Sequence, residues 1–340
     1  MTLIMVVLAF CGGVFGAILG ALEAFIFTGI TGLIGIALAC AGVPFDFLGV
    51  IAFGPFFAPN IAFAGGVGAA AFAKKIKVLD SGKNISLPLL SLKKISVPLV
   101  GGVFGVFGYI VAYGVGQALP GQIDAGGFTV VVSAIIAKIV FSGELFGKVT
   151  EEDKKLGGRY SPLAKTAWVP YMTAAAEKTV LSVAVGGLSA YVTYQMLQNQ
   201  QTAGAAPFVG FCISAVSLIF SQFGAPVPVT HHITLCASYA VLASGNLYWG
   251  IVAAIFAAFA GDFLARSLYN YGDVHIDPPA MTIALTSFLF LGLFKTAGLY
   301  QIPGEAAAAV ILIVAVIYSF LEYSWIQKKT AGHQGTKSAA

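Results

Sequence analysis

The chain has 340 residues, of which 58% are hydrophobic and only 9% are charged, and its mean hydropathy is +0.90. Soluble domains carry roughly 25% charged residues, so a chain this poor in charge has too little polar surface to stay in water, and the bilayer must be its solvent. The net charge of +4 does not indicate a nucleic-acid partner, because most lysines fall in two loops, as in proteins oriented in membranes.

Apolar segments of about 20 residues predict transmembrane helices. In chain order we expect eleven, at 3–26, 29–43, 48–73, 96–118, 126–147, 176–197, 206–222, 227–245, 247–268, 278–299 and 305–326. Prolines interrupt two of these segments, around 55–59 and 226–228, and a proline inside a membrane helix kinks or breaks it.

Positive charge predicts the topology. Lysines and one arginine cluster at 74–94, at 148–165 and at 328–337, whereas the linkers at 119–125, 198–205 and 300–304 contain none. With eleven spans all three basic clusters fall on one side, which the positive-inside rule makes the cytoplasm. We therefore expect a multi-pass protein of the plasma (inner) membrane with its N-terminus outside and its C-terminus inside.

An internal duplication organises the chain. Gln122-Ile-Asp-Ala-Gly-Gly-Phe-Thr129 reads against His275-Ile-Asp-Pro-Pro-Ala-Met-Thr282, and the surrounding segments align without gaps at offsets of 170 and then 153 residues. Each copy holds five predicted spans, an odd number, so the second copy enters the membrane the other way up. The fold class expected is an all-α polytopic membrane protein with two inverted-topology repeats of about five helices and one extra C-terminal helix.

This reading divides the chain into five parts. They are a first repeat at 1–150, a cytoplasmic linker at 151–175, a second repeat at 176–300, an extra transmembrane helix at 301–326 and a cytoplasmic tail at 327–340. Below, residues 1–150 are called the first half, 151–175 the linker and 176–300 the second half.

The duplicated phrases supply the leading site residues, Asp124 and Asp277, with Gln122 and His275 at their starts. Aspartate favours the N-cap of a helix, and Pro278 suits the first helical position, so a capping role is one reading. The other is a binding site: if these helices begin inside the membrane, their positive ends and the two carboxylates create a polar, ion-sized site.

The proline-broken segments are the second candidate, because unwound backbone at matching places in two repeats marks transporter sites. Asn60 aligns with Thr230, and His231 and His232 follow directly. Histidine titrates near neutral pH, which suits a proton-responsive site. Simple proline kinks and structural histidines are the alternatives. A metal site is not expected, since neighbouring residues of a helix point about 100° apart.

Two further charged residues lie within predicted spans. Asp262 pairs with Arg266 four residues on, and we expect that arginine to extend to the cytoplasm. Lys138 lies midway along 126–147, where an uncompensated charge costs roughly 3 kcal/mol, so it needs a partner or water. Glu177, Lys178, Lys295 and Glu322 are expected at membrane interfaces.

The sequence contains no nucleophile motif, Walker loop or dinucleotide fingerprint, and its four cysteines form no C-x-x-C pair. We therefore expect no cofactor and no enzymatic activity. The function indicated is secondary transport, proton- or cation-coupled, of a small solute or ion at the interface of the repeats. A passive channel and an intramembrane enzyme or lipid-handling subunit are the alternatives. The partners expected are membrane lipid and the solute, and a homo-oligomer stays open.

Overall fold

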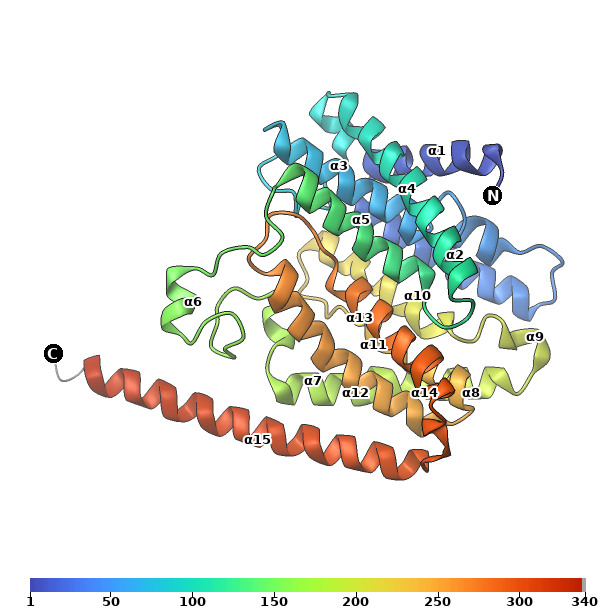
Figure 1. Cartoon of the computed structure of the whole chain (residues 1–340). Helices are drawn as coiled ribbons and strands as arrows, with labels where there is room; N and C mark the ends of the chain where they lie inside the picture. Colours follow the sequence, from blue (N-terminus) through green and yellow to red (C-terminus); the bar gives the residue numbers. More distant parts are fainter. Residues whose placement is uncertain (338–340) are drawn as a thin grey trace.

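The computed structural model describes residues 1–337, which form an all-helical molecule without β-strands (Figure 1). Six helices in it are long and apolar enough to cross a membrane, fewer than the eleven predicted. They are Ala21–Cys40, Ser96–Ala118, Ala175–Leu197, Leu247–Tyr269, Pro278–Thr296 and Gly304–Thr330. Three shorter apolar helices accompany them, Leu3–Leu19, Ala125–Phe141 and Phe208–Phe223. This set of helices is compatible with a membrane protein.

The first half consists of two apolar helices, a broken segment and three further helices. In order these are α1 (Leu3–Leu19), α2 (Ala21–Cys40), the π-helical turns η1 (Leu48–Ala52) and η2 (Pro59–Phe63), α3 (Ala64–Lys75), the 3-10 turn η3 (Leu89–Leu92), α4 (Ser96–Ala118) and α5 (Ala125–Phe141).

The linker and the second half follow with a similar sequence of elements. They are α6 (Glu151–Lys155), η4 (Pro170–Met172), α7 (Ala175–Leu181), η5 (Ser182–Gly186), α8 (Gly187–Leu197), α9 (Gln200–Ala203), α10 (Phe208–Ser217), η6 (Leu218–Phe223), α11 (His231–Ser244), α12 (Leu247–Leu264), η7 (Ala265–Tyr269), α13 (Pro278–Ser287), η8 (Phe288–Leu293), α14 (Phe294–Thr296) and η9 (Leu299–Gln301). The long helix α15 (Gly304–Lys337) ends the described chain.

Several predicted boundaries were wrong. The first span was expected to run over 3–26, but the helix breaks at Gly20, whose φ of 107° only glycine adopts readily. Gly29, where we placed the next helix start, lies inside α2, because helices that pack closely tolerate glycine in their interiors. The last helix was expected to stop at residue 326, but α15 continues to Lys337; residues 338–340 of the predicted tail lie outside the described residues.

The two predicted helix breaks are present. Between η1 and η2 the residues 53–58 are not helical, and η2 starts again at Pro59. In the second half the chain leaves helical conformation after Phe223 and resumes it at His231. Both breaks coincide with the prolines, which remove a backbone donor and cannot continue a helix.

Glycine lets the helices of the first half pack closely. A Cβ placed on Gly13 of α1 would lie 2.2 Å from the carbonyl oxygen of Gly101 in α4, and one placed on Gly65 of α3 would lie 2.6 Å from the Cα of Gly13. Backbones that approach this closely gain van der Waals contact without a hydrophobic driving force, as membrane interiors require.

In the second half, hydrogen bonds of side-chain hydroxyl groups join the helices. The Ser189 hydroxyl of α8 donates to the carbonyl of Thr234 in α11 at 2.9 Å, and the Thr193 hydroxyl donates to Ser238 at 2.8 Å. The hydroxyls of Ser214 in α10 and Thr234 lie 3.3 Å apart. All five side chains are buried, so these interhelical bonds fix α11 against α8 and α10.

The two halves meet through two pairs of helices. Helix α2 packs against α10, and α5 packs against α13. The largest apolar cluster draws on both halves, including Phe25, Phe63, Phe211 and Leu235. Helix α15 lies along one side of the molecule beside α12 and α7 (Figure 1), and most of its apolar surface is exposed.

Candidate functional site

Both Ile-Asp phrases end in a helix N-cap. The Asp124 Oδ1 atom accepts a hydrogen bond from the backbone N–H of Gly127 at 2.6 Å, at the start of α5. The Asp277 Oδ2 atom accepts one from Ala280 N–H at 2.8 Å, at the start of α13, with Pro278 at the first helical position. The capping reading of the phrases is therefore confirmed. Each cap uses one oxygen of its carboxylate, so the second oxygen is not involved in capping.

Helices α5 and α13 run antiparallel where they pack. The backbone N–H of Asp124 donates to the Ser287 hydroxyl at 2.9 Å, and three residues later Gly127 lies against Ile283, four residues earlier in α13. Ser287 is ten residues beyond Asp277, which at 1.5 Å rise per residue is about 15 Å along the helix. The two carboxylates therefore do not form the single ion-sized site expected of them.

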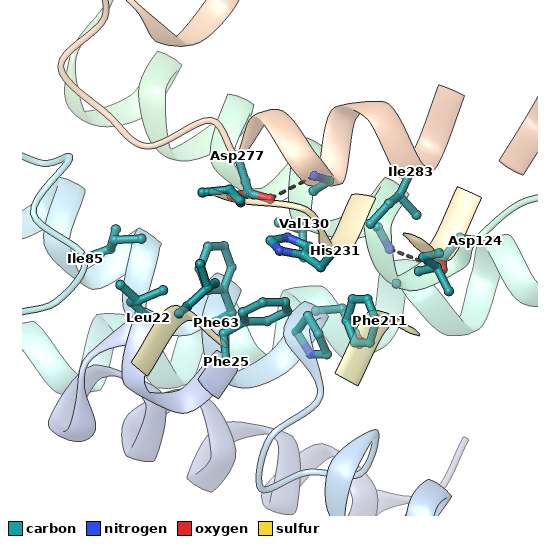
Figure 2. A pocket seen from close by; sticks show the side chains of 18 of the residues that line it. Leu22, Phe25, Phe63, Ile85, Asp124, Val130, Phe211, His231, Asp277 and Ile283 are labelled. Carbon is teal, nitrogen blue, oxygen red and sulfur yellow. Dashed lines mark hydrogen bonds between the residues drawn. The ribbon is translucent and has the colours of Figure 1, made fainter. Parts of the chain in front are cut away.

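One cavity of about 620 Å³ nevertheless reaches both aspartates (Figure 2). Residues of both halves and of the linker line it. Its walls are mainly apolar and aromatic, and Lys and Arg are missing from its lining residues. Of the ten residues proposed from sequence, five line it: Asn60, Asp124, His231, His275 and Asp277.

The Asp277 end of the cavity carries a histidine. The Nε2 atom of His275 lies 3.2 Å from Asp277 Oδ1, and His275 is 5% exposed. Its ring packs edge-on to Tyr269, with centroids 5.0 Å apart, and to Phe63, at 5.9 Å. The Nδ1 atom has no protein partner. A histidine held in this way donates to the carboxylate and orients it.

The Asp124 end is closed by a contact between the halves. The Tyr239 hydroxyl of α11 donates to Asp124 Oδ2 at 2.5 Å. Together with the Ser287 bond, this gives Asp124 two partners from the second half, whereas both partners of Asp277 are local.

Both broken segments contribute residues to the cavity wall, among them Asn60 from the first and His231 from the second. His231 starts α11 and packs against Phe25, with ring centroids 4.6 Å apart, and against Phe211 at 5.9 Å. Asn60 lies in η2, and its Nδ2 donates to the carbonyl of Gly108 at 3.3 Å. Thr230 faces away from the cavity, because its hydroxyl donates to Ser214 Oγ at 3.0 Å.

The remaining sequence candidates lie elsewhere. Gln122 is exposed and lies against Gly292 at the surface. His232 is 1% exposed and lines a separate cavity of about 20 Å³ together with Lys178 and Asp262. His231 and His232 therefore face different cavities, as their adjacent positions on a helix require.

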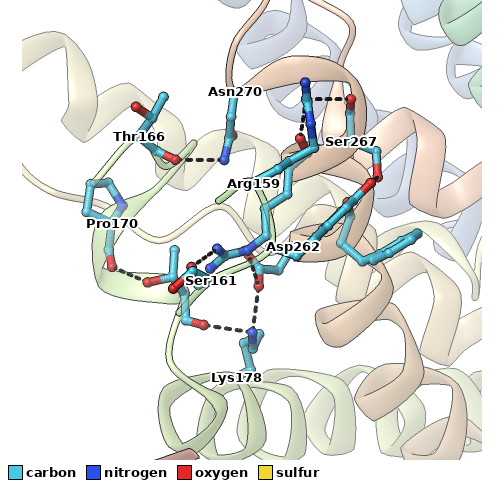
Figure 3. A network of polar contacts seen from close by, with 12 residues as sticks. Arg159, Ser161, Thr166, Pro170, Lys178, Asp262, Ser267 and Asn270 are labelled. Carbon is cyan, nitrogen blue, oxygen red and sulfur yellow. Dashed lines mark hydrogen bonds and ion pairs between the residues drawn. The ribbon is translucent and has the colours of Figure 1, made fainter. Parts of the chain in front are cut away.

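Asp262 is the centre of a buried ion-pair network (Figure 3). Its carboxylate lies 3.0 Å from Arg266 Nε, as the sequence spacing predicted, and 2.7 Å from Lys178 Nζ. The predicted extension of Arg266 into the cytoplasm was wrong, since the side chain is 5% exposed and donates to the Ser161 carbonyl at 2.7 Å. Lys178, which was expected at a membrane interface, is buried within the protein, where its ammonium group pairs with this carboxylate.

Glu322, also expected at a membrane interface, is buried between helices. It is 8% exposed and accepts a hydrogen bond from the backbone N–H of Ala175 at 2.5 Å, so it joins α15 to the start of α7.

Lys138 has the partner that its burial demands. Helix α5 ends at Phe141, so Lys138 lies in its last turn and not midway along a span. Its Nζ donates to the Leu268 carbonyl at 3.2 Å. Arg159 and Lys83 donate to other carbonyls at the end of η7, those of Arg266, Ser267 and Asn270. Cations at a helix C-terminus stabilise its free carbonyls.

The linker is folded onto the second half. Asp153 is buried and accepts hydrogen bonds from the backbone N–H of Lys165 at 2.6 Å and from the Tyr271 hydroxyl at 3.1 Å. Burial alone raises the pKa of Asp153, but hydrogen bonds from Thr166, Lys165 and Tyr271 outweigh it and lower the pKa to about 2.

Lys83 lies above the Tyr269 ring, and burial together with the nearby Lys138 lowers its pKa to about 8.

The comparisons place the chain in a family. A protein family of unknown function, DUF7973, matches residues 1–157 and 149–308. The chain is a member of DUF7973. No curated protein and no solved structure matches it. The two matched segments meet at the start of the linker, and most of α15 lies beyond them.

Sequence reasoning missed several cavity residues of this DUF7973 member. Tyr239 and the rings of Phe25, Phe63 and Phe211 lie in uniformly apolar segments, where no spacing distinguishes a cavity wall from a lipid-facing surface. Trp168 and Tyr171 also line the cavity, although they belong to the linker that we had read as a plain cytoplasmic connection. The presence of aromatic residues in a polar loop was a sequence signal for this cavity role, but it is a weak one.

No three His, Cys, Asp or Glu side chains within residues 1–330 gather closely enough to hold a metal ion.

Proposed function

We propose that this protein is a secondary transporter of the plasma membrane that moves a small solute through the cavity between its two halves. The observation that carries the proposal is the cavity itself: about 620 Å³, reaching the N-caps of two equivalent helices, α5 and α13. Small-molecule sites typically measure roughly 300–1,000 Å³ and are mainly apolar with a few polar groups.

An inverted-repeat architecture is part of this proposal. The ungapped alignment pairs α3 with α11, α4 with α12 and α5 with α13. Of the helices that join the halves, α5 and α13 are equivalent in this alignment, and they run antiparallel. The two segments matched by one family support the same division.

The depth of the aspartates follows from that architecture. The twofold axis of inverted repeats lies in the membrane plane, so equivalent residues lie equally far from the midplane on opposite sides. Asp124 and Asp277 are about 15 Å apart along α13, so with α13 along the membrane normal this proposal expects each to lie roughly 7 Å from the midplane. A hydrocarbon core about 30 Å thick then contains both carboxylates. In the same proposal the N-terminus of the chain lies outside and the C-terminus inside.

The proposed mechanism is rocking of one half against the other. Asp277, His275, His231, Asn60 and Asp124 contact the solute or a coupling cation as the cavity opens to one side and then the other. Thr230, His232, Asp262 and Lys138 hold the framework through the bonds and packing described above, and Gln122 lies at its surface. The chain acts without enzymatic chemistry in this proposal.

Accessibility to a membrane-impermeant maleimide tests the proposal without knowledge of the solute. Ile283 lines the cavity, so we would replace it with cysteine after changing Cys11, Cys40, Cys212 and Cys236 to alanine. Alternating access predicts modification of Ile283→Cys from either side of oriented vesicles. Ile255→Cys, in the packed interior of α12, is the control and should react from neither side.

The other outcomes contradict the proposal. Modification from one side only points to a pocket that never changes its exposure, as in an intramembrane enzyme. No modification from either side points to a structural subunit.

A further inference from the structure

The fixed charges around the cavity are all negative. Asp124 and Asp277 line it, and its lining residues include neither Lys nor Arg. Both aspartates cap helices, and the positive end of a helix favours the ionised carboxylate. An anion entering this cavity would meet two carboxylates and no cationic side chain, which disfavours it.

Asp277 and Asp124 each keep unused lone pairs for a cation, because each carboxylate accepts two hydrogen bonds. An ionised carboxylate offers about four lone-pair positions. The two hydrogen bonds to Asp124 measure 2.6 and 2.5 Å, whereas those to Asp277 measure 2.8 and 3.2 Å. Longer hydrogen bonds neutralise a carboxylate less, so Asp277 is the stronger attraction for positive charge.

Aromatic rings continue from Asp277 along the cavity wall. His275 meets Phe63 at 5.9 Å between centroids, Phe63 meets Phe25 at 6.0 Å, and Phe25 meets His231 at 4.6 Å. In Figure 2, Phe63, Phe25 and His231 are drawn below Asp277, and Asp124 lies to their right. Aromatic faces attract organic cations within about 6 Å, and their bodies bury apolar ligand surface.

The same cavity suits an inorganic ion poorly. Ca²⁺ and Mg²⁺ require about six or more oxygen ligands, and the two carboxylates are too far apart to share one such ion. A buried, unpartnered nitrogen on each of His231 and His275, both of which line the cavity, adds hydrogen-bonding groups suited to a molecule of several atoms.

We propose that the cavity binds a monovalent organic cation with an apolar body, its positive charge beside Asp277 and its body against Phe63 and Phe25. This names the solute class of the proposed transporter and so rests on that function. Binding itself does not require transport, which allows the two claims to be tested separately.

The experiment is calorimetric titration of the full chain in lipid nanodiscs with two probes of similar size and opposite charge, benzyltrimethylammonium and phenylmethanesulfonate. We expect the cation to bind and the anion to give no saturable heat. Asp277→Asn should weaken cation binding by at least ~10-fold, because a buried charge pair is lost. Asparagine is also a good N-cap, so this variant should fold.

Two variants complete the test. Asp46→Asn, an exposed aspartate outside the cavity, should bind the cation like the unmodified protein. Phe63→Leu keeps an apolar side chain but removes the ring, and should weaken cation binding several-fold. If Asp277→Asn does not fold, Phe63→Leu and the two probes still decide the question.

Equal binding of both probes, no cation binding, or unchanged affinity in Asp277→Asn and Phe63→Leu would overturn the solute class. Failure of transport itself has a different signature. Cation binding combined with one-sided labelling of Ile283→Cys would retain the ligand class and remove the transport proposal. Two-sided labelling of Ile283→Cys without cation binding would retain the transport proposal and remove the ligand class.

Discussion

The Tyr239 hydroxyl of the second half donates a hydrogen bond to the Asp124 carboxylate of the first half at 2.5 Å. Both side chains line the cavity, so this bond joins the halves at the wall of the proposed solute site. The backbone N–H of Asp124 also donates to the Ser287 hydroxyl. The cap of α5 is therefore completed by the second half, whereas the cap of α13 is completed by its own chain segment.

Removing this bond should loosen the interface without unfolding the protein. We expect Tyr239→Phe to lower the free energy of unfolding by about 1 to 2 kcal/mol, between the ~0.6 average of interhelical bonds in membranes and the ~3 upper value for charged partners. Denaturant unfolding in detergent micelles measures the change. Tyr248→Phe, at a residue 40% exposed, is the control and should alter stability little. If Tyr239→Phe leaves the free energy of unfolding unchanged, water replaces the lost hydroxyl.

A second prediction concerns the buried Asp262 network. Asp262→Asn leaves Lys178 and Arg266 buried without their carboxylate, and breaking a buried pair costs about 3–5 kcal/mol. We expect a large loss of thermal stability, measured in the same detergent. The matched control is Glu151→Gln, whose pair with Lys154 is exposed and should contribute little. Equal effects of the two substitutions would show that water reaches Asp262.

The linker provides a prediction about pH. The folded pKa of Asp153, about 2, lies below its ordinary value of 3.8. The carboxylate therefore stabilises the folded linker above about pH 4, and this contribution is lost as the pH falls toward 2. Hydrogen exchange at Lys165 and Thr166, corrected for intrinsic rates, should show protection that disappears over this range. Asp153→Asn should remove the pH dependence, and persistence of that dependence would assign it to another group.

How far the sequence predicted the site depends on whether each signal was local. Asp277 followed by Pro278 is a local capping pattern, and the prolines at the two breaks are local too, so both were predicted correctly. Lys178 was not, because its burial depends on Asp262, 84 residues away in the chain. The cavity role of Tyr239 depends likewise on Asp124. Gly20 broke a helix where Gly29 did not, and only the packing around each distinguishes them.

The last prediction tests whether the halves must move. A Cβ placed on Gly32 of α2 would lie 3.6 Å from the Cβ of Cys212 in α10, within the range of disulfides. Oxidised Gly32→Cys should therefore lock the two halves together. If the protein transports by rocking, uptake of benzyltrimethylammonium into proteoliposomes should stop on oxidation and return on reduction. Gly32→Cys combined with Cys212→Ser cannot form the bridge and should keep its uptake under oxidation. Undiminished uptake through the locked protein would instead favour a passive channel, because a pore already formed between the halves needs no rocking motion.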